Sequence, residues 1–264
     1  KSLEGGGLNM VGLGLLAVLT GLPEQIVAAV AAKSLKKRGQ AVLDAGLAGI
    51  RAGINMVEGM AGNCRLAVGT STAARWNISG NEAAGLGAVR GGVRFVAAYP
   101  ITPATEILEW LAPNLEKVGG VLVQAEDELA SINMIIGSSF GGTPSLTATS
   151  GPGLALMMES IGLAVSSETP IVVVNVMRGG PSTGIPTKSE QSDLNIALYG
   201  LHGDAPHVVT AAHSIADCQF TTQWSVHLAE QLQVPVLVLT DQSLGQSAGG
   251  KQPPPALPTI AAMR

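Results

Sequence analysis

From residue 94 onward, short apolar and β-branched runs alternate along the chain with longer stretches of helical periodicity. The apolar runs predict six strands, at residues 95–99, 121–124, 145–149, 171–176, 207–209 and 234–239. The stretches between them predict helices at residues 103–115, 127–140, 153–167, 188–198 and 214–232. Continuous apolar strands that alternate with helices are typical of a parallel sheet covered on both faces. The pattern therefore predicts a doubly wound α/β domain.

The chain before residue 94 has a different pattern. Residues 8–60 are mostly helix-like, with a polar hinge at 34–39, and residues 62–79 resemble a linker. The apolar run at 8–22 is shorter than the roughly 20 residues that a membrane-spanning helix needs, and it contains glycines, so we predict a buried helix. The tail from Gly249 has three consecutive prolines and predicts an exposed, extended end. The start reads like the middle of a domain, so we expect a fragment of a longer subunit without a signal peptide.

The composition narrows the function classes. Charged residues make up only 13% of the chain, and 15 basic against 19 acidic residues give a net charge of −4. Since the only basic cluster is Lys36, Lys37 and Arg38, we expect no nucleic-acid partner. Cys64 and Cys218 stand far apart and form neither a disulfide framework nor a ligand set for a metal or an iron–sulfur cluster. A reducing cytoplasm is the expected location.

Two glycine motifs have more than one interpretation. Gly12, Gly14 and Ala17 match a dinucleotide-binding fingerprint in letters, but no strand precedes them and no acidic residue follows about 20 positions on. We therefore favour a helix that packs closely through its glycines. The block 149–153, "TSGPG", lies at a strand-to-helix turn and is either a structural turn or an anion cradle of backbone N–H groups. A nucleophilic Ser150 lacks both the G-x-S-x-G pattern and a paired histidine.

Polar side chains follow three of the predicted strands. Thr102 lies between two prolines after the first strand, Glu126 and Glu128 follow the second, and Arg178 follows the fourth. Each has a structural alternative: a rigid strand–helix joint for Thr102, a favourable contact with a helix dipole for the glutamates, and an anchor for a polar loop for Arg178. Ligands of such sheets bind beyond the carboxyl ends of the strands. The convergence therefore indicates a functional site.

Five sequence blocks follow one another between Asn77 and Ser247: "GNEAAGLGAVRGGVRFVAAYPITPATEI", "QAEDELASINMIIGSSFGG", "TATSGPGLALMMESIGLA", "RGGPSTGIPTKSEQSDL" and "YGLHGDAP". In this order they resemble the α subunit of 2-oxoacid:ferredoxin oxidoreductases, most closely the 2-oxoglutarate branch with a γ-type domain fused ahead of the α part. The resemblance divides the chain into the C-terminal part of a γ-type domain plus linker at 1–76, a thiamine diphosphate pyrimidine-binding domain at 77–247, and a proline-rich tail at 248–264.

The resemblance implies an oxidoreductase that uses thiamine diphosphate to decarboxylate a 2-oxoacid, forms an acyl-CoA from coenzyme A and passes electrons to ferredoxin. A separate β subunit would bind the diphosphate, magnesium and an iron–sulfur cluster, and the near absence of cysteine fits that division. Because no G-D-G motif with a following asparagine occurs, we expect the chain to be active only with its β subunit, as a heterodimer. A truncated or non-catalytic relative that only binds a β-type partner is the alternative.

The same resemblance assigns residue roles. Glu128, with Gly137 at the usual spacing, would contact N1′ of the aminopyrimidine ring of the cofactor, and Glu126 is the fallback. Thr102 would hydrogen-bond the substrate. Arg178 would grip the 2-oxoacid carboxylate, for which a planar guanidinium suits better than an ammonium group.

Overall fold

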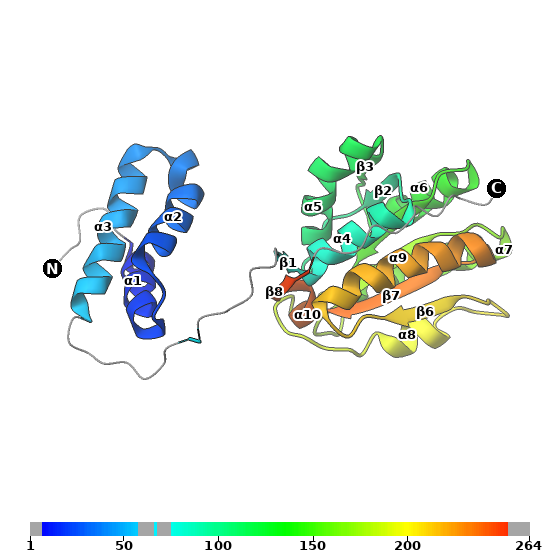
Figure 1. Cartoon of the computed structure of the whole chain (residues 1–264). Coiled ribbons are helices and arrows are strands. Elements are labelled where there is room, and N and C mark those ends of the chain that lie inside the picture. The colour runs from blue at the N-terminus through cyan, green and yellow to red at the C-terminus, as the bar shows by residue number, and fades with distance from the viewer. Residues whose placement is uncertain (1–6, 58–65, 68–74, 253–264) are drawn as a thin grey trace. The chain divides into compact units, whose positions relative to one another are not determined.

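The computed structural model describes residues 7–57, 66–67 and 75–252, and the chain divides into two compact units, Lys1–Thr72 and Ala73–Arg264. The described part of the first unit is helical (Figure 1). Its elements are α1 (Leu8–Thr20), α2 (Glu24–Leu35), the short 3-10 helix η1 (Lys36–Arg38) and α3 (Gln40–Met56). Gly39 has a φ of 98°, which separates η1 from α3 and accounts for the hinge predicted at 34–39.

Helices α1 and α3 pack closely at two glycines. A Cβ atom on Gly14 would lie 2.0 Å from the carbonyl oxygen of Ile50, and one on Gly53 would lie 2.0 Å from that of Val11. The glycines of α1 therefore permit helix packing, as the sequence indicated, and do not form a nucleotide-binding turn. Among the described residues, no helix is long and apolar enough to cross a membrane.

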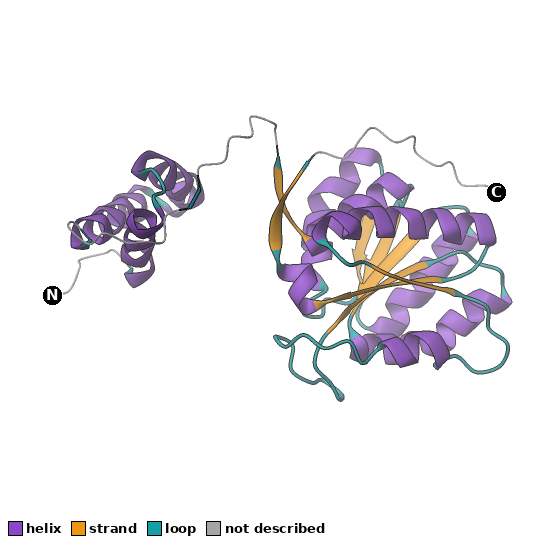
Figure 2. Cartoon of the chain, turned by 60° about the horizontal axis from the view of Figure 1, so that its bottom comes forward, coloured by secondary structure: helices purple, strands orange, loops and turns teal. Residues whose placement is uncertain are grey.

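The second unit is built on a six-stranded parallel sheet (Figure 2). The strands lie in the order β3-β2-β4-β5-β7-β6. Their bounds are Val121–Gln124 for β3, Phe95–Ala98 for β2, Ser145–Thr149 for β4, Val172–Met177 for β5, Val236–Asp241 for β7 and Val208–Ala211 for β6. All six predicted strands are present, each within two residues of its predicted ends.

Helices cover both faces of this sheet. Helices α4 (Gly80–Gly91), α5 (Thr105–Leu115) and α9 (Ile215–Leu232) pack over one core, which contains Val172, Val174 and Val176 of β5. Helices α6 (Glu128–Phe140) and α7 (Gly151–Ser166) pack over the other core, which contains Val173 of the same strand. Side chains of one strand thus alternate between two hydrophobic layers. This arrangement confirms the predicted doubly wound α/β fold.

Several elements differ from the prediction. Residues Trp76–Ser79, expected in a linker, form β1 and pair antiparallel with β8 (Ala248–Lys251), which takes in the first residues of the predicted tail. Helix α4 begins with a capping box between Ser79 and Glu82. The tail from residue 253 lies outside the described residues. The pairing of β1 with β8 joins segments from the two ends of the unit, so no local pattern predicts it.

The helix predicted at 188–198 is wrong over its first half. Only α8 (Leu194–Tyr199) is helical there, and a further short helix, α10 (Gln242–Gln246), follows β7. The Ser189 hydroxyl donates to Gln242 Oε1 at 2.9 Å, and Gln191 Nε2 donates to Asp241 Oδ2 at 2.7 Å. These side chains find partners about 50 residues away, and their segment stays a loop.

Candidate active site

The predicted site residues lie at the carboxyl edge of the sheet. Thr102 follows β2, Glu128 begins α6 after β3, and Arg178 comes directly after β5. The chain leaves β2 toward β3 on one side and continues with β4 on the other. The crevice at the carboxyl ends of β2 and β4 is therefore the topological switch point, where ligands of open α/β sheets bind.

Arg178 joins two loops of this edge. The residue is 7% exposed, and its Nη1 donates to the carbonyl oxygen of Thr102 at 2.5 Å. Its Nη2 donates to the carbonyl oxygen of Thr183 at 2.7 Å, while its buried Nε has no partner among the described residues. A guanidinium carries five N–H donors, so these two bonds leave donors for an anion. Thr102 itself is exposed.

Glu128 is held next to the first turn of α7. It is 8% exposed and is the first residue of α6, whose N-cap is Asp127. A Cβ atom on Gly153 would lie 2.9 Å from Glu128 Oε1 and 2.1 Å from Thr149 Oγ1, so glycine makes room for both side chains. In the described part of the chain, the Glu128 carboxylate makes no hydrogen bond or ion pair. Glu126, two residues earlier, is exposed.

Ser150 does not have the surroundings of a nucleophile. It is fully buried and is the N-cap of α7, which has no side-chain cap hydrogen bond. Its Oγ has no hydrogen-bond partner in the described residues, so no base is placed to activate it. The "SGPG" block is a strand-to-helix turn beside Glu128.

Two polar residues near Arg178 were not anticipated from the sequence. Asn175 is fully buried in β5, and its Nδ2 donates to Asp193 Oδ2 at 2.9 Å. Asp193 and Arg178 line the same open cavity of about 540 Å³, together with Gly151. Burial raises the pKa of Asp193 above its ordinary value, and Glu190 adds to the rise, whereas the bond from Asn175 and the charge of Arg178 oppose it. An asparagine inside the apolar run "VVVNVM" was the available signal.

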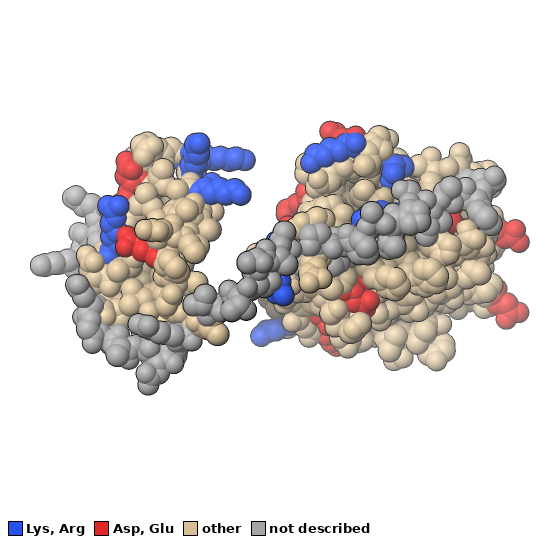
Figure 3. Space-filling model, viewed as in Figure 1, with Lys and Arg blue, Asp and Glu red and all other residues tan. Residues whose placement is uncertain are grey.

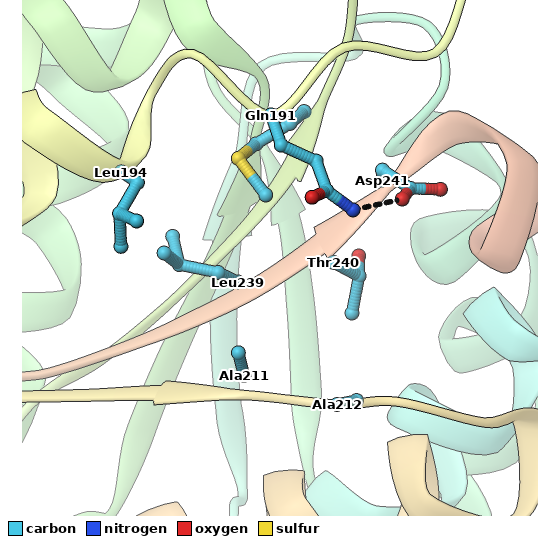
Figure 4. A pocket seen from close by; sticks show the side chains of 8 residues that line it. Gln191, Leu194, Ala211, Ala212, Leu239, Thr240 and Asp241 are labelled. Atoms are coloured by element: carbon cyan, nitrogen blue, oxygen red, sulfur yellow. Dashed lines mark hydrogen bonds between the residues drawn. The ribbon is translucent and has the colours of Figure 1, made fainter.

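The loop between Arg178 and Asp193 is anchored at several points. Besides the Gln191–Asp241 bond, which Figure 4 shows, Glu190 Oε2 accepts from the backbone N–H of Gly180 at 2.9 Å. A second cavity of about 160 Å³ lies next to the loop. It is lined at the ends of β5, β6 and β7 by Met177, Ala211, Ala212, Leu239, Thr240 and Asp241, with Gln191 and Leu194. Neither cavity is lined by Glu128.

The described residues of this unit show neither a cluster of metal ligands nor a large basic patch on the face in Figure 3. No group of three or more His, Cys, Asp and Glu side chains that could hold a metal occurs among the described residues. Lys and Arg side chains form no large patch on the face of the second unit shown in Figure 3. Among the described residues, Glu128 and Arg178 are the two buried charged side chains that follow strands at this edge of the sheet.

A doubly wound sheet with a buried acid and an arginine at its carboxyl edge is typical of a ligand-binding α/β domain. Residues 86–261 match the model of the pyruvate flavodoxin/ferredoxin oxidoreductase, thiamine diphosphate-binding family. The match covers more than half of the chain, and the chain belongs to this family.

Individual relatives of the chain agree with this family membership. The chain is 48% identical over 178 residues to the 2-oxoglutarate synthase subunit KorA of Archaeoglobus fulgidus, covering 67% of this chain and 51% of the relative. It is 44% identical over 181 residues to the 2-oxoglutarate oxidoreductase subunit KorA of Mycobacterium tuberculosis, covering 67% of this chain and 27% of the relative. The chain thus spans about half or less of the length of these relatives.

A solved structure extends the likeness over most of the chain. It is that of 2-oxoglutarate:ferredoxin oxidoreductase from Magnetococcus marinus with 2-oxoglutarate, coenzyme A and succinyl-CoA bound. The TM-score is 0.86 at 46% identity, and the alignment covers 93% of this chain and 43% of the other.

Proposed function

We propose that the chain is the α-type component of a 2-oxoacid:ferredoxin oxidoreductase that acts on 2-oxoglutarate. In the overall reaction, 2-oxoglutarate and coenzyme A give succinyl-CoA and carbon dioxide, and the two electrons released pass to ferredoxin. The observation that carries the proposal is the buried Glu128 carboxylate, which has no hydrogen-bond partner among the described residues, in a chain of a thiamine diphosphate-binding family.

The described residues fit the pyrimidine half of thiamine diphosphate. When bound, thiamine diphosphate would supply a nucleophilic carbon and an acceptor for the electron pair that decarboxylation releases. Glu128 would contact N1′ of the aminopyrimidine, because it is buried and its carboxylate accepts no hydrogen bond from the described residues. Gly153 keeps the neighbouring space open, since any larger residue would collide with Glu128. Glu126 is exposed and fits this role less well.

Arg178 and Thr102 would bind the substrate. The guanidinium lies in a protein-lined cavity, where hydrogen bonds to a carboxylate are short and strong. The backbone carbonyl of Thr102 accepts a hydrogen bond from the guanidinium, and Thr102 is exposed, so its hydroxyl is accessible to a ligand. The 2-oxoacid carboxylate would bind Arg178, and its keto oxygen would accept a hydrogen bond from Thr102.

A β-type partner would complete the cofactor site by binding the diphosphate and magnesium, and it would carry an iron–sulfur cluster. Helices α6 and α7, which begin at the site, together expose five large apolar side chains, namely Leu129, Met134, Phe140, Leu156 and Leu163. Gly137 on α6 and Gly162 on α7 have nothing within 4 Å of a Cβ position, although glycine inside a helix costs about 1 kcal/mol relative to alanine. Nothing in the described part of the second unit requires glycine there. We assign this face to contact with the partner.

The proposal also covers the division of the chain into domains and the cellular location of the enzyme. We assign residues 1–76 to the end of a γ-type domain plus linker, 77–247 to the pyrimidine-binding domain, and 248–264 to a tail whose first residues pair with β1 as β8. Ferredoxin as electron acceptor and two widely spaced cysteines favour a cytoplasmic enzyme. The alternative, a non-catalytic relative that binds only a β-type partner, would not need a buried carboxylate beside Gly153 that has no partner in the described part of the chain.

The test is reconstitution with the diphosphate-binding partner. We expect the assembled enzyme to reduce ferredoxin with 2-oxoglutarate and coenzyme A, and Glu128→Gln to abolish most of that activity while the complex still forms. Glu126→Gln is the matched control and should remain close to wild type. A complex that assembles with bound thiamine diphosphate but reduces no ferredoxin with any 2-oxoacid would favour the non-catalytic alternative.

A further inference from the structure

Asn175, which is fully buried, and Asp193, which is half-buried, form a polar pair that has no role in the function proposed above. Asn175 lies in the middle of β5, between valines, and is fully buried. An amide at such a position is costly unless its hydrogen bonds are satisfied. A valine would suit the strand better, so the amide has to be explained by what it contacts.

The hydrogen bonds of this amide fit a neutral acid better than a carboxylate. Asn175 Nδ2 donates to Asp193 Oδ2 at 2.9 Å, while Asn175 Oδ1 is buried without a partner in the described residues. A carboxylate only accepts hydrogen bonds and cannot satisfy Oδ1, whereas a protonated carboxyl group carries an O–H donor. A carboxylic acid and a primary amide can donate to each other in one cyclic pair.

The backbone around Asp193 leaves room for its carboxyl group. A Cβ atom on Gly151 would lie 2.8 Å from Asp193 Oδ1 and 2.9 Å from Oδ2, so glycine makes room for the carboxyl group. The preceding loop is held by the Gln191–Asp241 bond, and Asp193 lines the cavity of Arg178. The first turn of α7 thus contacts two acidic side chains, Asp193 next to Gly151 and Glu128 next to Gly153.

The charges around Asp193 come from few groups. Arg178 at the end of β5 and Glu190 in the same loop act on it, and neither the first turn of α7 nor α8 contributes an acidic or basic residue. Glu128 is the acidic residue on the other side of the α7 turn, next to Gly153. An anion that enters the cavity and binds Arg178 therefore places a further negative charge near Asp193, which disfavours its ionised form.

We propose that Asp193 is a positioning residue that takes up a proton when a 2-oxoacid anion binds at Arg178. The proton comes from solvent, the new O–H bond forms on the Asp193 carboxyl group, and that O–H donates to Asn175 Oδ1. The neutral pair then holds the first turn of α7 and the Arg178 loop around the bound anion. This inference rests on the proposed function of Arg178, and burial, which raises the pKa of Asp193, supports it.

The test is the pH dependence of the Michaelis constant for 2-oxoglutarate in the assembled enzyme. Uptake of one proton predicts that the wild-type constant rises by up to about tenfold per pH unit above the pKa of Asp193. Asp193→Asn mimics the neutral acid, because its amide can both donate to and accept from Asn175. We expect the Michaelis constant of this variant to be independent of pH and to stay within about twofold of the low-pH wild-type value, because the variant has no proton to take up. Asp204→Asn, which changes an exposed acid outside the cavity, should keep the wild-type slope.

The outcomes separate this inference from the function on which it rests. Failure of 2-oxoglutarate to bind at any pH overturns the proposed function. Binding with the same pH slope in Asp193→Asn and wild type overturns only the role of Asp193. If Asp193→Asn does not fold, infrared difference spectra of the wild-type enzyme decide: addition of 2-oxoglutarate should produce the band of a protonated carboxyl group, and its absence refutes the proposal.

Discussion

Replacing Arg178 by alanine separates two roles of one side chain. Its guanidinium donates to the carbonyl oxygens of Thr102 and Thr183, and the same group is proposed to bind the substrate carboxylate. Both threonines are exposed, so water can replace part of what the two carbonyls lose. We therefore expect the free energy of unfolding to fall by about 1–3 kcal/mol. At about 2–4 °C per kcal/mol for a domain of this size, Tm should fall by about 2–12 °C.

The loss of substrate affinity should be separate from this destabilisation. A hydrogen bond to a charged group contributes about 1.5–3 kcal/mol, which at about 1.4 kcal/mol per tenfold corresponds to a loss of about 10- to 150-fold. Arg178→Lys should recover part of both losses, because an ammonium group keeps the charge but cannot reproduce the planar fork. The Michaelis constant for 2-oxoglutarate and the Tm are measured on the same assembled preparations.

The control for Arg178 is Arg75→Ala, which removes an exposed arginine outside the Arg178 cavity. It should leave both quantities close to wild type. An Arg178→Ala enzyme with a lowered Tm and an unchanged Michaelis constant would refute the substrate role. The side chain would then only hold the loops after β2 and β5 together.

Three further predictions concern other residues. Glu128→Gln should lower kcat by about 10²–10⁴-fold without changing Tm, and a larger effect of Glu126→Gln would show that the assignment is wrong. Gly137→Ala should stabilise the unassembled chain by about 1 kcal/mol, whereas Gly137→Leu should weaken assembly with the partner in sedimentation velocity; unchanged assembly would contradict the partner face. Burial raises the pKa of Asp193, so wild-type stability should fall as pH rises from about 3.8 through that pKa. The Tm difference between Asp193→Asn and wild type should therefore grow with pH, and a constant difference would show that folding does not raise the pKa of Asp193.

The sheet could be predicted from the sequence because its signal is local. Each strand is a continuous apolar run, since it is buried on both faces, and each run ends at a turn. The strand ends in turn indicated where Thr102, Glu128 and Arg178 would lie, because parallel strands place their carboxyl ends at one edge. The helical first unit was predictable for the same reason. Its glycines were correctly interpreted as packing positions once no strand was found before them.

Only the tertiary structure decided the rest. The pairing of Trp76 with Lys251 and the loop before α8 depend on partners far away in sequence, which no window of neighbouring residues contains. The pairing of Asn175 with Asp193 arises in the same way. A local pattern shows that a polar residue lies inside an apolar strand, but which group reaches it depends on how the loop after that strand folds back. Hydrogen bonds and close packing act over a few ångströms in space, and their partners here lie far apart in the sequence.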